Sequence, residues 1–578
     1  MWNTIVRGIK YLKLLSFKKV LYAPHIFSSR EKRVLILLIS ITLVSGWIFS
    51  TRIYNRITVK VPGVGGIYKE AMLREPHVIN PLFAIQDTDR DISRLIFAGL
   101  FTYTGDGKIM PDLAENLEVS ADGKLYSVTL RQGLKWHDGV NLTSEDIIFT
   151  VKTIQNPQYK SVLRPNWQGV EVEALNSHTV RFSLRTPYAP FIENLTTGII
   201  PKHIWEDVGP EQVLLNEFNL KPIGAGPYQF NRFKQDKDGS ILTYEVSRNT
   251  DYHREGPFIS SITFFFFKNE EEALRALRKG VVNGFGPVSS ARLADFPAKN
   301  ISVHSVTMPR MFGIFFNDQQ APQLADKKVR EAIARVIDKK KIATELAEGS
   351  ASATDAPFEL PDSSLIKNPY PYDPERAKKL LLEAGWKDEN KDGVLEKQVR
   401  IKQKIATQEL RLTLTTSDWP DLRQAALLIK DELKKIDIEV IIKALPFSEL
   451  ESTVIRPRNF EILLFGEVYG YEPDPFAFWH SSQSKDPGLN IVRYSNKKAD
   501  QILEDTRRLS DEFRRREKYQ ELANIIIEDL PAVFLYSQLY LYILPADLKG
   551  VELNTISLPS DRFNEINTWY FKTKRVLK

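Results

Sequence analysis

The sequence predicts an α/β protein with a partly parallel sheet, preceded by one helix that can cross a membrane. The stretch DLRQAALLIKDELKKI (421–436) has apolar residues at a helical spacing and runs into the strand-like IEVIIK (438–443). A helix leading directly into a strand is typical of a βαβ unit, whose strands lie parallel. The third observation is VLILLISITLVSGWIFS (34–50), which contains no charged residue.

The N-terminal region predicts a membrane anchor with a defined orientation. Residues 1–33 carry eight basic residues and one acid, a net of +7. Because basic residues favour the cytoplasmic side, residues 1–33 are expected in the cytoplasm and everything after residue 50 outside. A cleaved signal peptide is the alternative, but the basic segment is long and the junction is not a clean cleavage site. Residues 51–66 are interpreted as an extended linker.

Three further segments have readable boundaries. LYSVTLRQGLKW (125–136) alternates around a Gln-Gly pair and predicts a β-hairpin. Residues 326–349 predict a helix that closes on Gly349. The segment 373–385 predicts a helix with Asp373 as N-cap, Pro374 at its first position and Gly385 at its end.

Composition excludes several classes of function. The 578 residues include no Cys, so the chain has no disulfide, no thiolate ligand or nucleophile, and no Cys to carry a lipid. Outside residues 1–33 there are 71 basic and 72 acidic residues. Such a neutral body lacks the concentrated basic face that nucleic acids require, so no nucleic-acid partner is expected.

The segment KWHDG (135–139) has the composition of a catalytic site but a simpler structural explanation. His137 stands beside Asp138, and Thr143 and Asp146 follow. Asp138 with Gly139 is a turn pair, and Thr143 with Asp146 predicts a capping box at the start of a helix. We therefore interpret the segment as scaffold and expect neither catalytic residues nor an enzyme.

The chain resembles family 5 of the extracellular solute-binding proteins, the peptide-binding class that serves ABC importers. The most specific block is IFAGLFTYTGDGKIMPDLAENLEVSADGKLYSVTLRQGLKWHDGVNLTSEDIIFT (96–150). INPLFA (79–84) precedes it. Five more blocks follow in family order: 186–206, 221–230, 248–267, 315–338 and 373–386.

The resemblance implies a periplasmic-binding-protein-like fold, of the class II or cluster C type, in which two α/β lobes close on a ligand about a hinge. The chain would then comprise a basic cytoplasmic segment (1–33), a transmembrane signal anchor (34–50) and a linker (51–66). The lobes follow. The expected parts are the main part of lobe I (67–102, 220–310 and 542–571), its extra subdomain (103–219) and lobe II (311–541).

The resemblance also implies where a ligand binds. Family members pair with a peptide's main chain near the hinge, and the matching strands here are 310–317 and 223–230. An acid that holds the peptide's α-amino group is expected within 463–480. The family's Asp aligns near Val468 or Tyr469, which are not acids, so Glu467, Glu472 and Asp474 are the candidates, with Glu467 favoured. The full set of expected ligand-binding residues is Asn80, Trp167, Gly226, Met311, Phe312, Gly313, Trp419, Glu467, Tyr469, Tyr471, Asp474 and Trp479. Core packing is the alternative for the aromatic residues.

One acidic loop allows a calcium site. WKDENKDGVLE (386–396) places Asp388, Asn390 and Asp392 like the start of an EF-hand loop, with Glu396 at loop position nine. The usual Glu at position twelve is replaced by Val399. A solvated turn is the alternative, and no other cofactor is expected.

Three hypotheses follow. The first is a peptide-binding component of an ABC importer, a monomer tethered to the cell membrane by a single helix, with its binding domain on the extracytoplasmic side. The second is a binder of the same fold for nickel, haem or an oligosaccharide. The third is a surface peptide receptor that does not transport.

Overall fold

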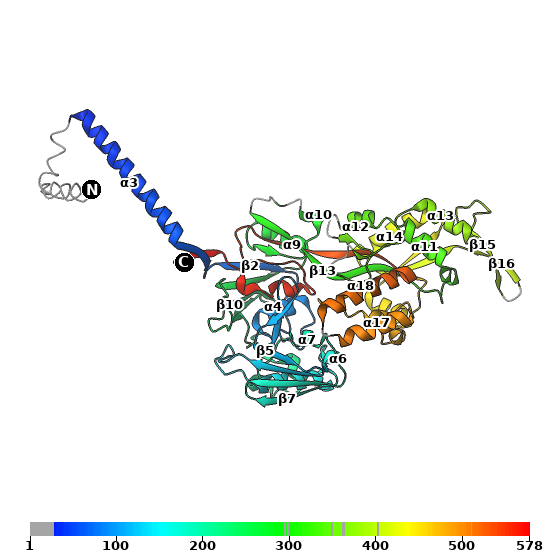
Figure 1. The fold of residues 1–578 in the computed structure, drawn as a ribbon, viewed down its shortest axis with the longest axis horizontal. Coiled ribbons are helices and arrows are strands. Elements are labelled where there is room, and N and C mark those ends of the chain that lie inside the picture. The colour runs from blue at the N-terminus through cyan, green and yellow to red at the C-terminus, as the bar shows by residue number, and fades with distance from the viewer. Residues whose placement is uncertain are drawn as a thin grey trace, which may run out of the picture. The chain divides into compact units, whose positions relative to one another are not determined.

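The structure is a computed structural model that describes residues 28–577, except 294–295, 297–299, 348–350, 361–364, 402–403 and 510. The chain divides into two compact units (Figure 1). The small unit comprises Met1–Gly63 and Lys572–Lys578, and the body comprises Val64–Phe571.

In residues 28–63 and 572–577, the described part of the small unit, one long helix is followed by a two-stranded ribbon. The helix α3 (Ser29–Ile57) begins with a capping box, in which Ser28 and Glu31 exchange side-chain-to-backbone hydrogen bonds. β1 (Thr58–Gly63) follows at once and pairs antiparallel with the C-terminal β21 (Lys572–Leu577). The interpretation of residues 51–66 as an extended linker is therefore wrong. A strand whose partner lies more than 500 residues away gives no local signal.

The body is organised by one large mixed sheet. Its strands follow the order β18-β17-β19-β13-β20-β12-β2-β11-β10-β9, and β14 also pairs with β20. β17 and β18 are parallel and joined by α14 (Pro420–Lys434), which confirms the predicted βαβ unit. The bounds are β2 (Ile67–Met72), β9 (Tyr228–Gln235), β10 (Ile241–Arg248), β11 (Ser261–Phe266), β12 (Gly284–Phe285), β13 (Ile301–Phe316), β14 (Ala351–Ala353), β17 (Arg411–Ser417), β18 (Glu439–Leu445), β19 (Ile462–Val468) and β20 (Ala532–Pro545).

Two long strands, β13 and β20, connect the separate hydrophobic cores of the body. Val306 and Met308 of β13 belong to one core, while Met311 and Ile314 belong to others. The pairing of β13 with β20 shifts register between Thr307↔Leu539 and Met311↔Ser537. We call the part around the first core, together with a smaller core that includes Ala71, Leu274 and Ile543, lobe I (residues 68–308 and 540–569). The part around the cores that contain Met311 and Ile314 (311–536) is lobe II. The register shift marks the crossing, because an irregular ladder bends more readily than a regular one.

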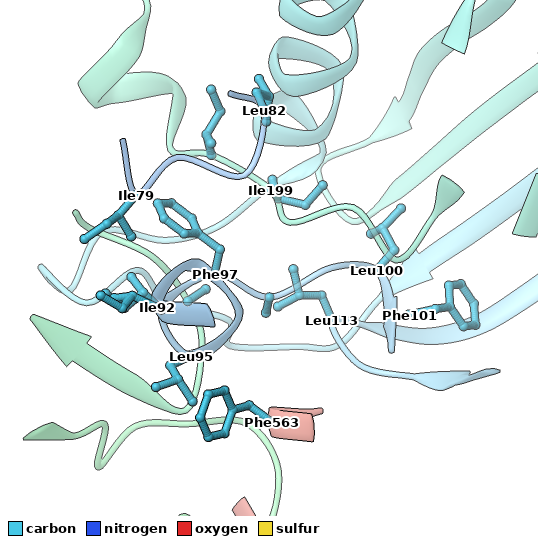
Figure 2. Close-up of a cluster of buried hydrophobic side chains, with 14 of the residues drawn as sticks. Ile79, Leu82, Ile92, Leu95, Phe97, Leu100, Phe101, Leu113, Ile199 and Phe563 are labelled. Carbon is cyan, nitrogen blue, oxygen red and sulfur yellow. The ribbon is translucent and has the colours of Figure 1, made fainter. Parts of the chain in front are cut away.

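Lobe I packs helices and a second sheet against the large sheet. Its first core joins α4 (Asp87–Ile96) to the C-terminal segment, and Figure 2 shows Phe563 beside Leu95. A four-stranded sheet of order β5-β6-β8-β7 covers α5 (Ser144–Gln155). The remaining elements are β3 (Phe101–Tyr103), β4 (Ile109–Pro111), β5 (Ala114–Val119), β6 (Leu125–Leu130), α6 (Arg164–Trp167), β7 (Val170–Asn176), β8 (Thr179–Leu184), α7 (Phe191–Asn194), α8 (Lys202–Trp205), α9 (Glu270–Arg278) and α10 (Ser290–Leu293).

Lobe II has helices on both faces of its part of the sheet. Because side chains alternate along β19, Ile462 and Leu464 enter one core while Leu463 enters the other. The core that contains Ile462 and Leu464 includes residues of α11 (Lys327–Val336), α12 (Lys339–Ala347) and α13 (Pro374–Glu383), together with α14. The core that contains Leu463 includes residues of α15 (Phe447–Leu450), α16 (Phe476–Trp479), α17 (Lys497–Arg508) and α18 (Glu512–Asp529). A separate ribbon, β15 (Glu396–Ile401) with β16 (Lys404–Glu409), completes the lobe.

Of three segments whose boundaries the sequence predicts, the structure confirms one and differs at the other two. The caps predicted for α13 are confirmed, since the Asp373 side chain accepts from Arg376 N–H and Gly385 has a positive φ of 86°. The predicted hairpin over 125–136 is wrong, because β6 pairs with β5 and β8 instead. The helix expected over 326–349 is interrupted at Ile337 and continues as α12, and Gly349 lies outside the described residues.

Candidate ligand-binding site

The crossing strands bring three expected binding residues to the centre of the body. Met311 is buried in lobe II and lies opposite Glu467 in the ladder of β13 with β19. The Phe312 ring stacks on Tyr536 of β20 with centroids 5.0 Å apart. A Cβ on Gly313 would lie 2.8 Å from the Val533 carbonyl oxygen, so glycine permits the close approach of these strands.

The second strand assigned to the hinge lies elsewhere. Residues 228–235 form β9, which is the last strand at the lobe I end of the sheet. Gly226 precedes it and donates to the Ile96 carbonyl at 2.8 Å. The assignment of 223–230 to the hinge is therefore corrected, because β20 and not this segment crosses beside β13.

Glu467 is a buried carboxylate without a cationic partner in the described part of the chain. Its residue is 4% exposed. Tyr469 O–H donates to Glu467 Oε2 at 2.5 Å, and Trp479 Nε1–H donates to the Tyr469 hydroxyl at 3.2 Å. Burial raises the pKa of Glu467 to about 8. Tyr469 and Trp479 are themselves buried in a core of lobe II. Their hydrogen bonds therefore hold the Glu467 carboxyl in place.

The other two candidate acids are already ion-paired. Arg515 Nε donates to Glu472 Oε1 at 2.6 Å, and Arg507 holds Asp474 with a shortest contact of 2.6 Å. A ligand ammonium would have to compete with a guanidinium at either position. The geometry therefore favours Glu467, because no cation among the described residues already pairs with it.

The segment 469–476 of lobe II contacts lobe I directly. The ring of Tyr471 stacks on Tyr103, with centroids 4.1 Å apart. The Glu472 amide donates to Glu193 Oε1 of α7 at 2.9 Å. Burial, together with the nearby carboxylates of Glu472 and Asp474, raises the pKa of Glu193 to about 7. Sequence reasoning missed Glu193, because nothing in the surrounding residues indicates that it meets the other lobe.

A second contact between the lobes centres on Arg507. Its guanidinium lies 3.8 Å from the Phe476 ring centroid and 5.3 Å from that of Tyr188 in lobe I. Tyr188 O–H donates to Asp474 at 3.3 Å, and Ala189 N–H donates to the Arg507 carbonyl at 2.9 Å. The lobes are therefore held together on this side by hydrogen bonds and a cation over two rings.

Aromatic residues separate into a surface row and core residues. Trp419 is 54% exposed and follows the carboxyl end of β17, where open α/β sheets bind ligands. Its ring stacks on Phe447 at 5.9 Å, and Phe447 stacks on Phe465 at 6.2 Å. In contrast, Trp167 packs in the core of lobe I against Phe182 and Phe191.

Two expected binding residues and His137 have structural partners. The Asn80 side-chain oxygen accepts from Leu82 N–H at 3.1 Å and so closes a turn. His137 Nδ1 accepts from Gly224 N–H and Nε2 bonds the Gly226 carbonyl, both at 3.1 Å. Burial lowers the pKa of His137 to about 4. The neutral ring therefore links two loops, as the scaffold interpretation of KWHDG predicts, and the predicted capping box of Thr143 with Asp146 is present.

The acidic loop uses its carboxylates to bind its own backbone. Asp388 accepts from Asp392 N–H at 3.2 Å and from Gly393 N–H at 3.1 Å. The Asn390 oxygen accepts from Asp392 N–H, and Glu396 accepts from Glu389 N–H. Among the described residues, no three acidic, His or Cys side chains gather as a metal site. Calcium binding stays a prediction.

Lobe I residues line two cavities, one of which lobe II shares. One of 940 Å³ lies between the lobes, with Tyr188, Phe191 and Arg185 on one side and Phe476 and Arg507 on the other. The second, of 910 Å³, is lined by residues 77–89, 158–162 and 209–214 of lobe I alone. The two lobes thus meet beside an irregular ladder of β13 with β20, and the candidate features are a buried acid without a cation, an exposed aromatic row and a cavity between the lobes.

Comparison with known proteins decides the family. A model of the bacterial extracellular solute-binding proteins, family 5 (middle), matches residues 108–488, more than half of the chain. The chain belongs to this family. Family 5 proteins bind solutes, and the mixed α/β fold of two lobes is confirmed.

Relatives match over most of their length. Oligopeptide-binding protein AppA of Bacillus subtilis is 29% identical over 526 residues, which cover 88% of this chain and 92% of the relative. The structure of AppA in complex with a nonapeptide superposes with a TM-score of 0.66 at 28% identity, covering 89% of this chain and 100% of the chain in that structure. NikZ of Campylobacter jejuni in complex with Ni(L-His) gives a TM-score of 0.67 at 27% identity, covering 87% of this chain and 99% of NikZ.

Proposed function

We propose that this chain captures peptides outside the cytoplasm by closing its lobes about β13 and β20, and delivers them to the permease subunits of an ABC importer. Glu467 carries the proposal. Burial keeps the Glu467 carboxyl mainly protonated near neutral pH. A peptide's α-ammonium placed beside it would favour the carboxylate, which would release its proton to solvent and pair with the ammonium. Oligopeptide binding by the relative AppA supports the same ligand class.

The remaining contacts follow from general peptide chemistry. β17 pairs with β19 only at Ile462 and Leu463, so residues 465–468 of β19 have no paired strand on that side in the described ladders. Their main chain offers donors and acceptors that suit any peptide sequence. The row of Trp419, Phe447 and Phe465 provides an apolar surface for ligand side chains. No covalent step is needed, so the proposed role is that of a binding protein and not of an enzyme.

We further propose that α3 tethers the protein, as a monomer, to the cell membrane in a single pass. At about 1.5 Å per residue its 29 residues span about 43 Å, more than the roughly 30 Å of a bilayer core. The basic residues 1–33 place its N-terminal end in the cytoplasm. The mass of the mature protein tests this, because cleavage would remove the basic segment.

Native mass spectrometry of the full chain, purified in detergent without refolding, tests the ligand class. We expect a ladder of additional masses that fragment into amino acids. A single sharp adduct of nickel, haem or an oligosaccharide would overturn peptide capture in favour of a dedicated ligand. The absence of any adduct, even after incubation with mixed peptides, would also overturn it. Peptide binding without peptide uptake in cells would instead indicate a receptor that does not transport.

A further inference from the structure

The ribbon of the small unit, with the last turns of α3, carries basic residues and no acid. Residues 51–63 and 572–577 contain no Asp or Glu. On β1 and β21 the charged side chains are mostly exposed. The six basic residues are Arg52, Arg56, Lys60, Lys572, Lys574 and Arg575.

Several of these charges are placed where they repel one another. Lys60 lies directly opposite Arg575 in the ribbon, and like charges in that position destabilise a strand pair. Arg52 and Arg56 are four residues apart on α3, which is also unfavourable for like charges. Arg575 is nevertheless held in place, because its Nη1 donates to Thr58 Oγ1 at 2.8 Å and its guanidinium lies 5.3 Å from the Tyr54 ring centroid. Such an arrangement is stable when an anionic partner neutralises it.

The pairing places all of these charges near the end of α3. β1 begins at the residue after the helix ends, and Leu577 lies opposite Thr58. Six strand residues extend only about 20 Å. Apolar side chains are exposed on the same unit, among them Tyr54, Val59 and Leu577. Basic and apolar side chains mixed in this way suit the boundary between lipid headgroups and acyl chains.

We propose that this basic ribbon lies on the anionic headgroups of the bilayer that α3 enters, on the outer leaflet. The inference rests on the proposed tethering by α3. Its chemical partner is the lipid phosphate. The six basic residues would all lie within about 20 Å of the headgroups, a distance of about two Debye lengths, so they attract the phosphates. The C-terminal strand thereby acts as a second attachment, which returns the end of the chain to the membrane surface.

The absence of Cys allows a direct measurement. The variant Thr573→Cys has a single thiol, which a fluorophore labels on an exposed position of β21. The labelled full chain is reconstituted into vesicles of phosphatidylcholine alone or mixed with phosphatidylglycerol, and quenching by a headgroup spin-labelled lipid is recorded. We expect quenching to be about twofold greater in the anionic vesicles and to fall as salt rises from about 0.05 M to about 0.5 M.

A matched pair of charge variants sharpens the test. Lys60→Gln/Lys572→Gln/Lys574→Gln removes three charges from the ribbon and keeps Arg575 with its bond to Thr58. Lys152→Gln/Lys234→Gln/Lys279→Gln removes three from exposed positions of the body. We expect the first variant to lose the lipid dependence and the second to retain it.

The outcomes separate the ribbon from the anchor. Equal quenching of the unsubstituted ribbon in both kinds of vesicle, at every salt concentration, would overturn the proposal whether or not the variants fold. Quenching that disappears only when a soluble anionic cell-wall polymer is added would assign the ribbon to that polymer instead. Extraction of the chain from the vesicles by alkaline carbonate would instead refute tethering by α3.

Discussion

Two buried acidic centres of the body differ in whether the fold supplies their counter-charge. In lobe I, Arg562 bonds both oxygens of Asp91 at 2.8 Å and Glu70 at 3.1 Å, with all three side chains at most 3% exposed. In lobe II, Glu467 is similarly buried, and among the described side chains only the Tyr469 hydroxyl bonds it. The first centre is complete without a ligand, whereas the second has an acid that no cation among the described residues pairs with, so a ligand ammonium can provide its partner.

The difference separates structural from functional acids. Arg562 joins the C-terminal segment to β2 and α4, so it connects distant parts of lobe I. Glu467 lies opposite Met311, next to the crossing between the lobes. A buried acid is therefore informative only when its partners are known, because Glu70, Asp91 and Glu467 are all hidden from solvent.

The largest effect is expected from breaking the complete centre. Arg562→Met leaves Glu70 and Asp91 buried without a cation and should lower the free energy of unfolding by about 3–5 kcal/mol. Urea denaturation followed by circular dichroism measures the change. The neighbouring Arg94→Met is the control, because Arg94 is partly exposed and pairs with Asp561, so its loss should cost about 1 kcal/mol. Similar losses for both variants would contradict the comparison.

Replacing Glu467, which has no cationic partner, should weaken peptide binding more than it weakens the fold. Glu467→Gln keeps the shape of the side chain but cannot form the carboxylate that pairs with the peptide's ammonium. We therefore expect peptide affinity to fall about tenfold to a hundredfold. Isothermal titration with a peptide and with its N-acetylated form measures this, and the acetylated peptide should bind both proteins alike. Glu472→Gln is the control, because Glu472 already pairs with Arg515. A greater loss for the control would show that the anchor has been misplaced.

The same substitution should change how stability depends on pH. The pKa of Glu467 is raised to about 8 in the folded state, so the folded protein holds a proton that the unfolded chain releases near pH 4.5. Its contribution is complete below pH 4.5 and is lost as pH rises through 8. The difference between the native protein and Glu467→Gln should therefore change by about 1–3 kcal/mol between pH 5 and pH 8. Parallel stability curves for the two proteins would contradict the burial of an unpaired carboxylate.

Sequence alone predicts the parts of this protein whose causes are local or shared by its family. The caps of α13, the βαβ unit of β17, α14 and β18, and the scaffold role of His137 all follow from neighbouring residues. The aromatic residues show the limit, since both Trp419 and Trp479 were expected to bind ligand, but Trp419 is exposed and Trp479 is buried.

The missed features depend on contacts between distant segments. Residues 51–63 could not be recognised as helix end and strand without β21. Glu193 could not be connected with Glu472 because the two belong to different lobes. The choice among Glu467, Glu472 and Asp474 required their partners, Arg515 and Arg507, which lie more than 30 residues away in the chain.

The smallest effect is expected where the lobes meet at the surface. Arg507→Gln removes the cation between Tyr188 and Phe476 and leaves Asp474 without its partner, but this contact is only partly buried. We expect the dissociation constant for peptide to rise about threefold, mainly through faster release, because the closed state loses its attachment while Glu467 stays intact. Stopped-flow measurement of release resolves this. Arg508→Gln is the control, since Arg508 lines the same cavity from the next position and should leave release unchanged. If both variants released peptide alike, the charge of the cavity and not the attachment by Arg507 would control closure, and the role of Glu467 as the principal charge for the ligand would be unaffected.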